Sequence, residues 1–112
     1  MKKLVHIVIP AYQPTNILFE LITSLLEIAD ESQKNNTKII VINDGSTAAE
    51  SVEVFAKITA AFKKVVLLRH QSNSGKGNAL KTGFSFIKDN FKGTSWVVTA
   101  DADGQHLAND IW

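Results

Sequence analysis

Two carboxylates near the end of this sequence have a spacing that suits metal chemistry. Asp101 and Asp103 directly follow the apolar run Trp96–Ala100, with Ala102 between them. A carboxylate at the end of a buried strand is costly to desolvate unless it is paired or bound to a metal. Two carboxylate oxygens on one loop can hold Mg²⁺ or Mn²⁺ and leave coordination positions open for a phosphate. The spacing therefore predicts a divalent metal site that engages a phosphorylated ligand.

Residues next to this pair can add to the metal site. Gln105 offers a carbonyl oxygen two residues after Asp103 and is predicted as a metal ligand, with Asp101 as a further candidate. His106 is interpreted as a loop residue. The alternative for Asp103 and Gly104 is an ordinary turn, because Asp-Gly pairs are common in surface loops.

Asp44 and the segment at the end of the first apolar run suit nucleotide binding. Asp44 follows the second apolar run, where an acidic residue can accept hydrogen bonds from a base or a ribose. The backbone of Pro10 and Ala11 can line a base pocket, and Tyr12 can stack on a ring. The alternatives are structural: an anion near a helix N-terminus for Asp44, and an aromatic side chain packed on the following helix for Tyr12.

The glycine-rich loop Asn73–Ala79 opens a predicted helix and suits a phosphate. Backbone amides around Gly75 and the helix dipole favour an anion, and Lys76 adds a point charge. The loop is not a Walker A motif, because the first glycine, the spacing and the Ser/Thr after the lysine are missing. Arg69 ends the third apolar run and is predicted to contact the base or a phosphate.

Length and composition place these motifs in a single domain. The chain has 112 residues, a net charge of +1 and no cysteine, which excludes disulfides and thiolate sites and gives no argument for a nucleic-acid partner. The apolar run near the N-terminus is too short for a signal peptide or a membrane span.

We expect a cytoplasmic chain, or one at the cytoplasmic face of a membrane in the full-length protein. His6 and His70 are interpreted as structural residues without partners.

Apolar runs alternate with amphipathic segments along the chain. The predicted strands are Leu4–Ile9, closed by Pro10, then Lys38–Ile42, Val65–Leu68 and Trp96–Ala100. The predicted helices cover 16–31, a segment that begins at a capping box of Thr47 and Glu50, and 76–90. The expected inward face of the second helix is Val52, Phe55, Ala56, Thr59 and Phe62. All four strands look buried on both faces.

This alternation predicts an α/β, three-layer, Rossmann-like fold with a parallel sheet in the order 3-2-1-4. The loops that follow parallel strands share one edge, and ligands bind there where the strand order reverses. That position lies between the first and fourth strands. We therefore expect the segment 10–12 to lie beside Asp101–Asp103.

Four segments in this order resemble the N-terminal half of a family 2 glycosyltransferase, a nucleotide-sugar-dependent enzyme of the GT-A fold. They are Val8–Tyr12, Val41–Ser46, Asn73–Ala79 and Asp101–His106. The resemblance implies that residues 1–112 form the nucleotide-binding part of the catalytic domain. It would bind a UDP- or GDP-linked sugar with Mg²⁺ or Mn²⁺. The acceptor would be a glycan or a polyprenyl phosphate, because the last segment is similar to the polyprenyl-phosphate mannosyl- and glucosyltransferase branch.

The resemblance also implies roles for individual residues. Asp101 would lie near the ribose and the lysine loop, Asp103 would ligate a metal that bridges the diphosphate, and Gln105 would join the metal shell. The donor-binding residues expected in total are Pro10, Ala11, Tyr12, Asp44, Arg69, Gly75, Lys76, Asp101 and Ala102.

The sequence departs from the family's pattern in how little of it follows the metal motif. Only Leu107–Trp112 follow the metal motif, whereas the acceptor-side strands and the catalytic base of such enzymes lie further downstream. We therefore expect a truncated fold, a catalytic base beyond Trp112, and no activity from this fragment alone. We also expect self-association through the exposed edge of the fourth strand.

Other classes remain as alternatives. A sugar-phosphate nucleotidyltransferase shares the fold, but it needs a glycine-rich, basic signature after the first strand, where Ala11–Thr15 has neither glycine nor a basic residue. A receiver-like domain needs an acidic pair at the same place, which is missing. A non-catalytic nucleotide-binding module stays open as the non-enzymatic alternative.

Overall fold

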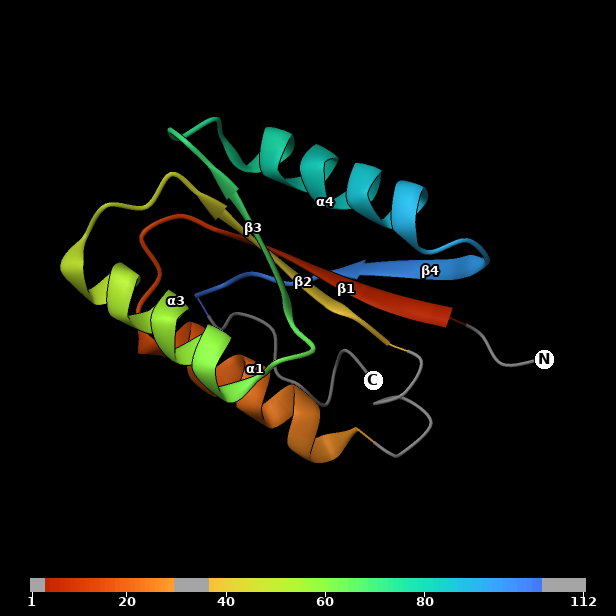
Figure 1. The fold of residues 1–112 in the computed structure, drawn as a ribbon, viewed down its shortest axis with the longest axis horizontal. Helices are drawn as coiled ribbons and strands as arrows, with labels where there is room; N and C mark the ends of the chain where they lie inside the picture. The colour runs from red at the N-terminus through yellow and green to blue at the C-terminus, as the bar shows by residue number, and fades with distance from the viewer. Residues whose placement is uncertain (1–3, 30–36, 104–112) are drawn as a thin grey trace.

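A computed structural model describes residues 4–29 and 37–103 of the chain. The strands are β1 (Leu4–Ala11), β2 (Ile39–Asp44), β3 (Val66–His70) and β4 (Thr94–Thr99). The helices are α1 (Asn16–Ile28), α3 (Ala49–Ala61) and α4 (Lys76–Asn90). In this part of the chain the strands form one parallel sheet in the order β3-β2-β1-β4 (Figure 1). The predicted α/β fold and strand order are confirmed.

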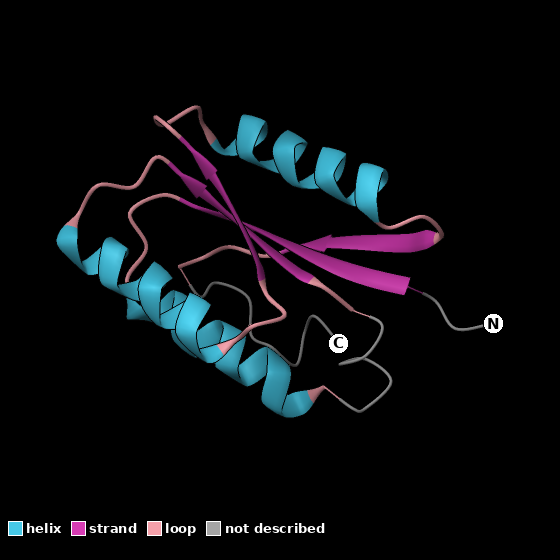
Figure 2. Ribbon diagram, in the orientation of Figure 1, coloured by secondary structure: helices cyan, strands magenta, loops and turns pink. Residues whose placement is uncertain are grey.

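Alternate residues of β1 and β2 build two cores, one on each face of the sheet. Ile9 and Val41 face α1 and α3, whereas Val8 and Ile42 face α4. This period of two follows from the pleat of a strand, which points successive side chains to opposite faces. The helices therefore form an outer layer on each side, as Figure 2 shows.

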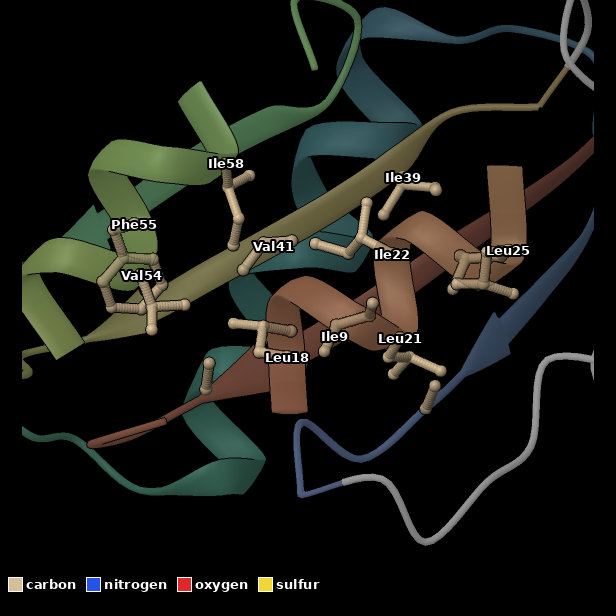
Figure 3. Packing of buried hydrophobic residues seen from close by; sticks show 13 residues of the cluster. Ile9, Leu18, Leu21, Ile22, Leu25, Ile39, Val41, Val54, Phe55 and Ile58 are labelled. Atoms are coloured by element: carbon tan, nitrogen blue, oxygen red, sulfur yellow. The ribbon is translucent and has the colours of Figure 1, made fainter. Parts of the chain in front are cut away.

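The larger core lies between the sheet and the pair α1 and α3 (Figure 3). α1 buries Leu18, Leu21, Ile22 and Leu25, which repeat at the three- and four-residue spacing of a helix face. Its first turn is capped by Thr15, whose side chain accepts a hydrogen bond from the amide of Ile17 at 3.3 Å. α1 ends at Ile28, earlier than expected.

α4 covers the other face and has the predicted bounds. It packs on the sheet through Gly83, where an added Cβ would lie 2.6 Å from Cγ1 of Val8 and 3.0 Å from Cδ1 of Ile42. Only glycine permits this close approach. The contact fixes the height of α4 above the sheet, and with it the position of the loop that precedes the helix.

β1 continues past Pro10, so the prediction that Pro10 closes the strand is wrong. Pro10 pairs with Ile42 and Ala11 pairs with Asn43. Along β1, the backbone groups of successive residues point alternately toward β2 and toward β4. The amide of Ile7 donates to the carbonyl of Lys38 on the β2 side, whereas the carbonyl of Val8 accepts from the amide of Ala100 on the β4 side. The missing amide of Pro10 therefore faces the β4 side, beyond the end of β4, and the pairing with β2 loses nothing.

The capping box expected at the start of α3 is also wrong. α3 begins after Ala48, whose own side chain makes no capping hydrogen bond. Instead, Oε1 of Gln13 accepts hydrogen bonds from the amides of Thr47 and Ala48, each at 2.9 Å. The acceptor thus comes from the loop after β1, a position that local sequence cannot reveal.

The buried face of α3 differs from the expected one by a rotation about the helix. The buried residues are Ser51, Val54, Phe55 and Ile58. Val52 is 58% exposed, because Ser51 occupies the inward position and donates a hydrogen bond to the carbonyl of Pro14 at 3.0 Å. A polar side chain with a buried partner has taken the place expected for an apolar one.

Burial on both faces holds for the central strands and not for the outer ones. β2 is buried throughout and β1 is mostly buried from Val5 to Ala11, whereas β3 is half-buried and Trp96 and Val97 of β4 are 56% and 38% exposed. The difference arises because β3 and β4 are the outer strands of the described sheet. None of the helices in residues 4–29 and 37–103 is both long and apolar enough to cross a membrane.

Candidate functional site

A cavity of about 500 Å³ opens at the carboxyl ends of β1, β2 and β4. It lies where the strand order reverses, as expected for a ligand site in such a sheet. Its lining residues are Pro10, Ala11, Tyr12, Asp44, Asn73, Lys76, Ala79, Asp101, Ala102 and Asp103. The predicted convergence of segments far apart in the sequence is therefore present in the structure.

Of the predicted site residues that the structure describes, Arg69 and Gly75 are not in this lining. Arg69 is exposed on β3, between Leu68 and His70; since Leu68 packs toward α4, alternation turns Arg69 to the opposite face. Gly75 lies in the adjoining loop, where its amide is already bonded. Gln105 lies outside the described residues.

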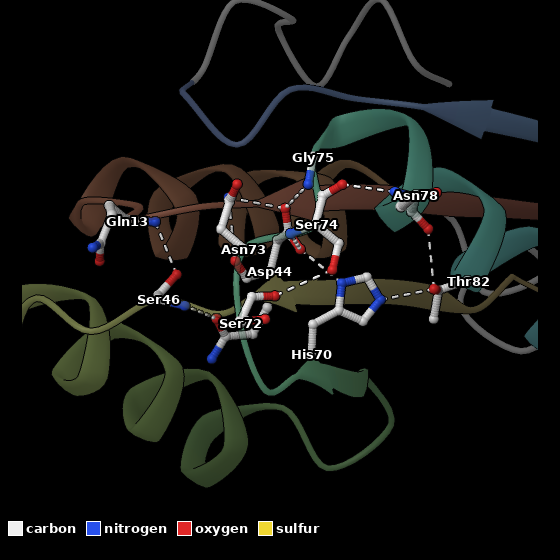
Figure 4. Close-up of polar contacts among 11 residues, drawn as sticks. Gln13, Asp44, Ser46, His70, Ser72, Asn73, Ser74, Gly75, Asn78 and Thr82 are labelled. Atoms are coloured by element: carbon white, nitrogen blue, oxygen red, sulfur yellow. Dashed lines mark hydrogen bonds and ion pairs between the residues drawn. The ribbon is translucent and has the colours of Figure 1, made fainter.

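The carboxylate of Asp44 is the centre of a buried hydrogen-bond network (Figure 4). Oδ1 accepts from Nδ1 of His70 at 2.7 Å and from the amide of Ser74 at 2.9 Å. Oδ2 accepts from the amide of Gly75 at 2.9 Å and from the side chain of Asn73 at 3.1 Å. Asp44 thereby ties the end of β2 to the whole loop that leads into α4.

This network holds Asp44 ionised. Burial raises the pKa of Asp44, but the hydrogen bonds from His70, Ser74 and Gly75 outweigh burial and bring the pKa below its ordinary value. An ionised carboxylate offers about four lone-pair positions, and the chain's own donors use them. A bound base could therefore reach Asp44 only by replacing one of these donors, of which Asn73 is the most distant.

Gly45 allows the loop to approach Asp44 so closely. Its φ is +75°, and an added Cβ would lie 2.4 Å from the carbonyl carbon of Ser72 and 2.5 Å from the amide of Asn73. Both the backbone angle and the contact exclude a side chain here. The backbone angle and the close approach of the loop therefore explain why a glycine stands at this position of the Asn-Asp-Gly-Ser segment.

The loop after β1 is fixed in a similar way to the loop after β2. The amide of Gln13 donates to Oγ of Ser46 at 2.8 Å, and the amide of Ser46 donates to Oδ1 of Asn43 at 2.9 Å. These bonds fix the residue that follows Tyr12, and Tyr12 itself lines the cavity and is 54% exposed. An exposed aromatic ring in this position can stack on a planar ligand.

The opposite wall of the cavity carries charge. Nζ of Lys76, at the start of α4, lies 2.9 Å from Oδ1 of Asp101, just beyond β4. Asp103 lines the same cavity and is exposed. The site thus combines a planar surface at Tyr12 with a lysine and two carboxylates.

Comparison with known proteins assigns the chain to a family. The family model described as glycosyl transferase family 2 matches residues 6–111. The chain belongs to glycosyl transferase family 2. Its sequence is 29% identical to the UDP-N-acetylglucosamine–dolichyl-phosphate N-acetylglucosaminyltransferase of Methanococcus voltae, with 97% of this chain and 45% of that protein covered. It is 26% identical to the dolichyl-phosphate β-glucosyltransferase of Saccharomyces cerevisiae, with 94% and 31% covered.

A solved structure with the same fold is the mannosyltransferase PcManGT from Pyrobaculum calidifontis, in complex with GDP-Man and Mn²⁺. The two structures superpose with a TM-score of 0.69 at 19% identity, over 92% of this chain and 28% of that one. This family 2 chain therefore has the GT-A fold. It spans less than half of the length of these curated relatives.

The side-chain oxygen atoms in the cavity of this family 2 chain fit a divalent cation. Asp101 and Asp103 place two hard carboxylates on one loop, which suits Mg²⁺ or Mn²⁺. Within residues 4–29 and 37–103, no group of three His, Cys, Asp or Glu side chains is placed to hold a metal. A cation held by these two carboxylates would keep coordination positions open for ligand oxygens.

Side chains in and around the family 2 site were missed or misjudged from sequence. Asn73 and Ala79 line the cavity, although the sequence predicts them only as the two ends of the glycine-rich loop 73–79. The interpretation of His70 as lacking a partner is wrong, since it contacts both Asp44 and Thr82. The same interpretation of His6 is also wrong, since its Nδ1 accepts a hydrogen bond from the amide of Lys38. Register could have indicated the contact of His70 with Asp44, because Asp44 and His70 are direct partners in the parallel pairing of β2 with β3.

Proposed function

We propose that this family 2 chain is the donor-binding part of a glycosyltransferase. The observation that carries this proposal is the shared cavity, which collects Tyr12, Lys76, Asp101 and Asp103 from separate loops. A nucleoside diphosphate sugar needs a flat surface for its base and positive charge for its diphosphate. The cavity supplies the ring of Tyr12 for the first and Lys76 for the second.

Asp101 and Asp103 would hold Mg²⁺ or Mn²⁺, and that cation would neutralise charge on the departing diphosphate. Lys76 would donate a charged hydrogen bond to a phosphate oxygen. Asp44 would keep the loop before Lys76 in place. The catalytic base and the acceptor side belong, in this proposal, to sequence beyond Trp112, and Gln105 remains a candidate ligand.

The acceptor class follows from the relatives. Both curated relatives carry dolichyl phosphate in their names, so we propose a polyprenyl phosphate as the acceptor of the whole protein. Such an acceptor resides in a membrane, which places the reaction at a membrane surface. A non-catalytic nucleotide-binding module is the second candidate, because the described cavity supports binding and contains no assigned base.

Titration calorimetry with GDP and UDP, each with and without Mn²⁺, tests the binding proposal. We expect one diphosphate to bind at a single site only when the metal is present. Failure of both nucleotides to bind with Mn²⁺, or equal binding without it, would contradict the proposal. Transfer of sugar to a polyprenyl phosphate by the whole protein separates an enzyme from a binding module.

A further inference from the structure

We infer that His70 is a positioning residue for the candidate diphosphate site and acts as a doubly protonated imidazolium between Asp44 and Thr82. The part of this inference that concerns ligand binding rests on the proposed function. The part that concerns the protein alone does not. His70 does not line the cavity, so any effect on the ligand passes through Asp44 and its loop.

The contacts form a continuous line from β2 to α4 (Figure 4). Nδ1 of His70 lies 2.7 Å from Oδ1 of Asp44, and Nε2 lies 2.8 Å from Oγ1 of Thr82. Oγ1 of Thr82 in turn donates to the carbonyl of Asn78 at 3.0 Å. The side chains of His70 and Asp44 are only 17% and 3% exposed.

Matching donors with acceptors along this line indicates the protonation state. An ionised carboxylate only accepts, so Nδ1 of His70 must carry a proton. If Nε2 were unprotonated, the single hydroxyl proton of Thr82 would be shared between Nε2 and the carbonyl of Asn78. If Nε2 is protonated, it donates to Thr82, and Thr82 donates to Asn78. Only the imidazolium gives every contact one donor and one acceptor.

Charge around the ring is consistent with this state. Asp44 on β2 is in direct contact with Nδ1, and an opposite charge at this distance favours the charged ring. Lys81 on α4 lines a surface depression together with His70, and its positive charge disfavours a charged ring. The carboxylate of Asp44 is buried and hydrogen-bonded directly to the ring, whereas Lys81 is exposed to water.

The imidazolium matters because the same carboxylate holds the loop before Lys76. The amides of Ser74 and Gly75 both donate to Asp44. Losing the charge at His70 would leave Asp44 as a buried anion with weaker compensation. The loop would then loosen, and Lys76 would lose its fixed position opposite Asp101.

The ring nitrogens of His70, observed by ¹⁵N NMR at pH 7 in the 112-residue chain, test the protonation state directly. We expect both nitrogens to show shifts of a protonated ring. His6 gives a reference in the same spectrum, since its Nδ1 accepts from the amide of Lys38 at 3.0 Å and is therefore unprotonated. A neutral His70 ring would overturn the inference, whatever the chain binds.

Amide hydrogen exchange tests the positioning role. In His70→Phe we expect the amides of Ser74 and Gly75 to exchange about tenfold faster than in the wild type, since a charge-assisted bond is lost. The amide of Ile9 should be unchanged. Thr82→Val, which removes the partner of Nε2, should show the same effect more weakly. Unchanged exchange at both loop amides in both variants would contradict the role.

Nucleotide binding separates this inference from the proposed function. With GDP or UDP and Mn²⁺, His70→Phe should bind about tenfold more weakly than the wild type, because the loop held by Asp44 loses a charge-assisted bond. Unchanged affinity in His70→Phe would overturn the positioning role. If the wild type binds neither nucleotide, the proposed function fails, while the ring spectrum and the exchange rates still decide the state and role of His70.

Discussion

Nζ of Lys76 lies 2.9 Å from Oδ1 of Asp101, so the start of α4 and the segment after β4 meet across the candidate site. The lysine side chain is 64% exposed and the carboxylate 25%. An ion pair this open to water contributes little to stability. The Lys76–Asp101 ion pair can therefore break at a low cost in free energy, so that Lys76 contacts a diphosphate and Asp101 contacts a cation.

Lys76→Met should separate binding from stability. We expect the free energy of unfolding to change by less than about 1 kcal/mol. The affinity for GDP or UDP with Mn²⁺ should fall about tenfold or more, because a charged hydrogen bond to phosphate is lost. Urea unfolding and calorimetry measure the two effects. Lys88→Met, in the last turn of the same helix, is the matched control and should bind like the wild type.

Asp103→Asn should weaken the metal dependence of binding. The change keeps the shape of the side chain and deletes one anionic ligand, so Mn²⁺ should strengthen nucleotide binding about 10–100-fold less than in the wild type. Asp89→Asn changes an exposed carboxylate of α4 outside the cavity and is the control. If Asp103→Asn retains the full Mn²⁺ effect, the metal assignment of Asp103 is wrong.

Gly45→Ala should destabilise the fold by about 1–3 kcal/mol or more, because it adds strain at a positive φ and a clash with the backbone of Ser72 and Asn73. Gly77→Ala is a matched control within the same region, since nothing lies within 4 Å of its added Cβ. In a helix, this second change should be neutral or stabilising by up to about 1 kcal/mol. Equal unfolding midpoints in urea for the two variants would contradict the close approach at Gly45.

The fold was predictable because its signals repeat along the chain. Val8, Ile9, Val41 and Ile42 lie in short apolar runs separated by helical periodicity, and this alternation predicts a parallel sheet with two covered faces. The rule that loops after parallel strands share an edge then places Tyr12 near Asp103. The cavity confirms that placement.

The details that sequence could not give depend on contacts between distant segments. Gln13 supplies the acceptor at the start of α3 from more than thirty residues away, so the local Thr47 and Glu50 pattern was misleading. Asp44 looked available for a ligand, yet its oxygens are used by His70 and by the loop before α4. Such partners become visible only when the register and the loop paths are known.

His6 should make stability depend on pH. Burial, and then the charge of Lys38, lowers its pKa below the ordinary value of 6.5. Below pH 6.5 the unfolded chain therefore binds a proton at His6 that the folded chain does not, and stability falls as the pH falls. The slope from this residue is at most about 1.4 kcal/mol per pH unit.

His6→Gln keeps an acceptor for the amide of Lys38 and removes the titration. Urea unfolding at pH 7.5 and pH 5.0 should therefore show a smaller acid loss of stability in the variant than in the wild type. Parallel pH profiles for the two proteins would show that His6 does not carry this dependence.

The outer edge of β4 should promote self-association. Within the described sheet β4 pairs with β1 alone, and Trp96 is 56% exposed on it. Trp96→Lys should reduce association measured by sedimentation velocity, because a charge on an edge strand opposes pairing. Val52→Lys changes an equally exposed apolar residue on α3 and should have no effect. A monomeric wild type at high concentration would contradict this prediction.

A cation and a diphosphate should share the cavity between Tyr12 and Asp103, and paramagnetic broadening by Mn²⁺ reports where the cation binds. With GDP or UDP present, Mn²⁺ should broaden the amide signals of Lys76, Ala102 and Asp103, while Mg²⁺ leaves their linewidths unchanged. Signals of Thr23 and Val65, at the amino-end side of the sheet, should stay sharp. Broadening centred on those two residues, or spread evenly over the chain, would contradict the account.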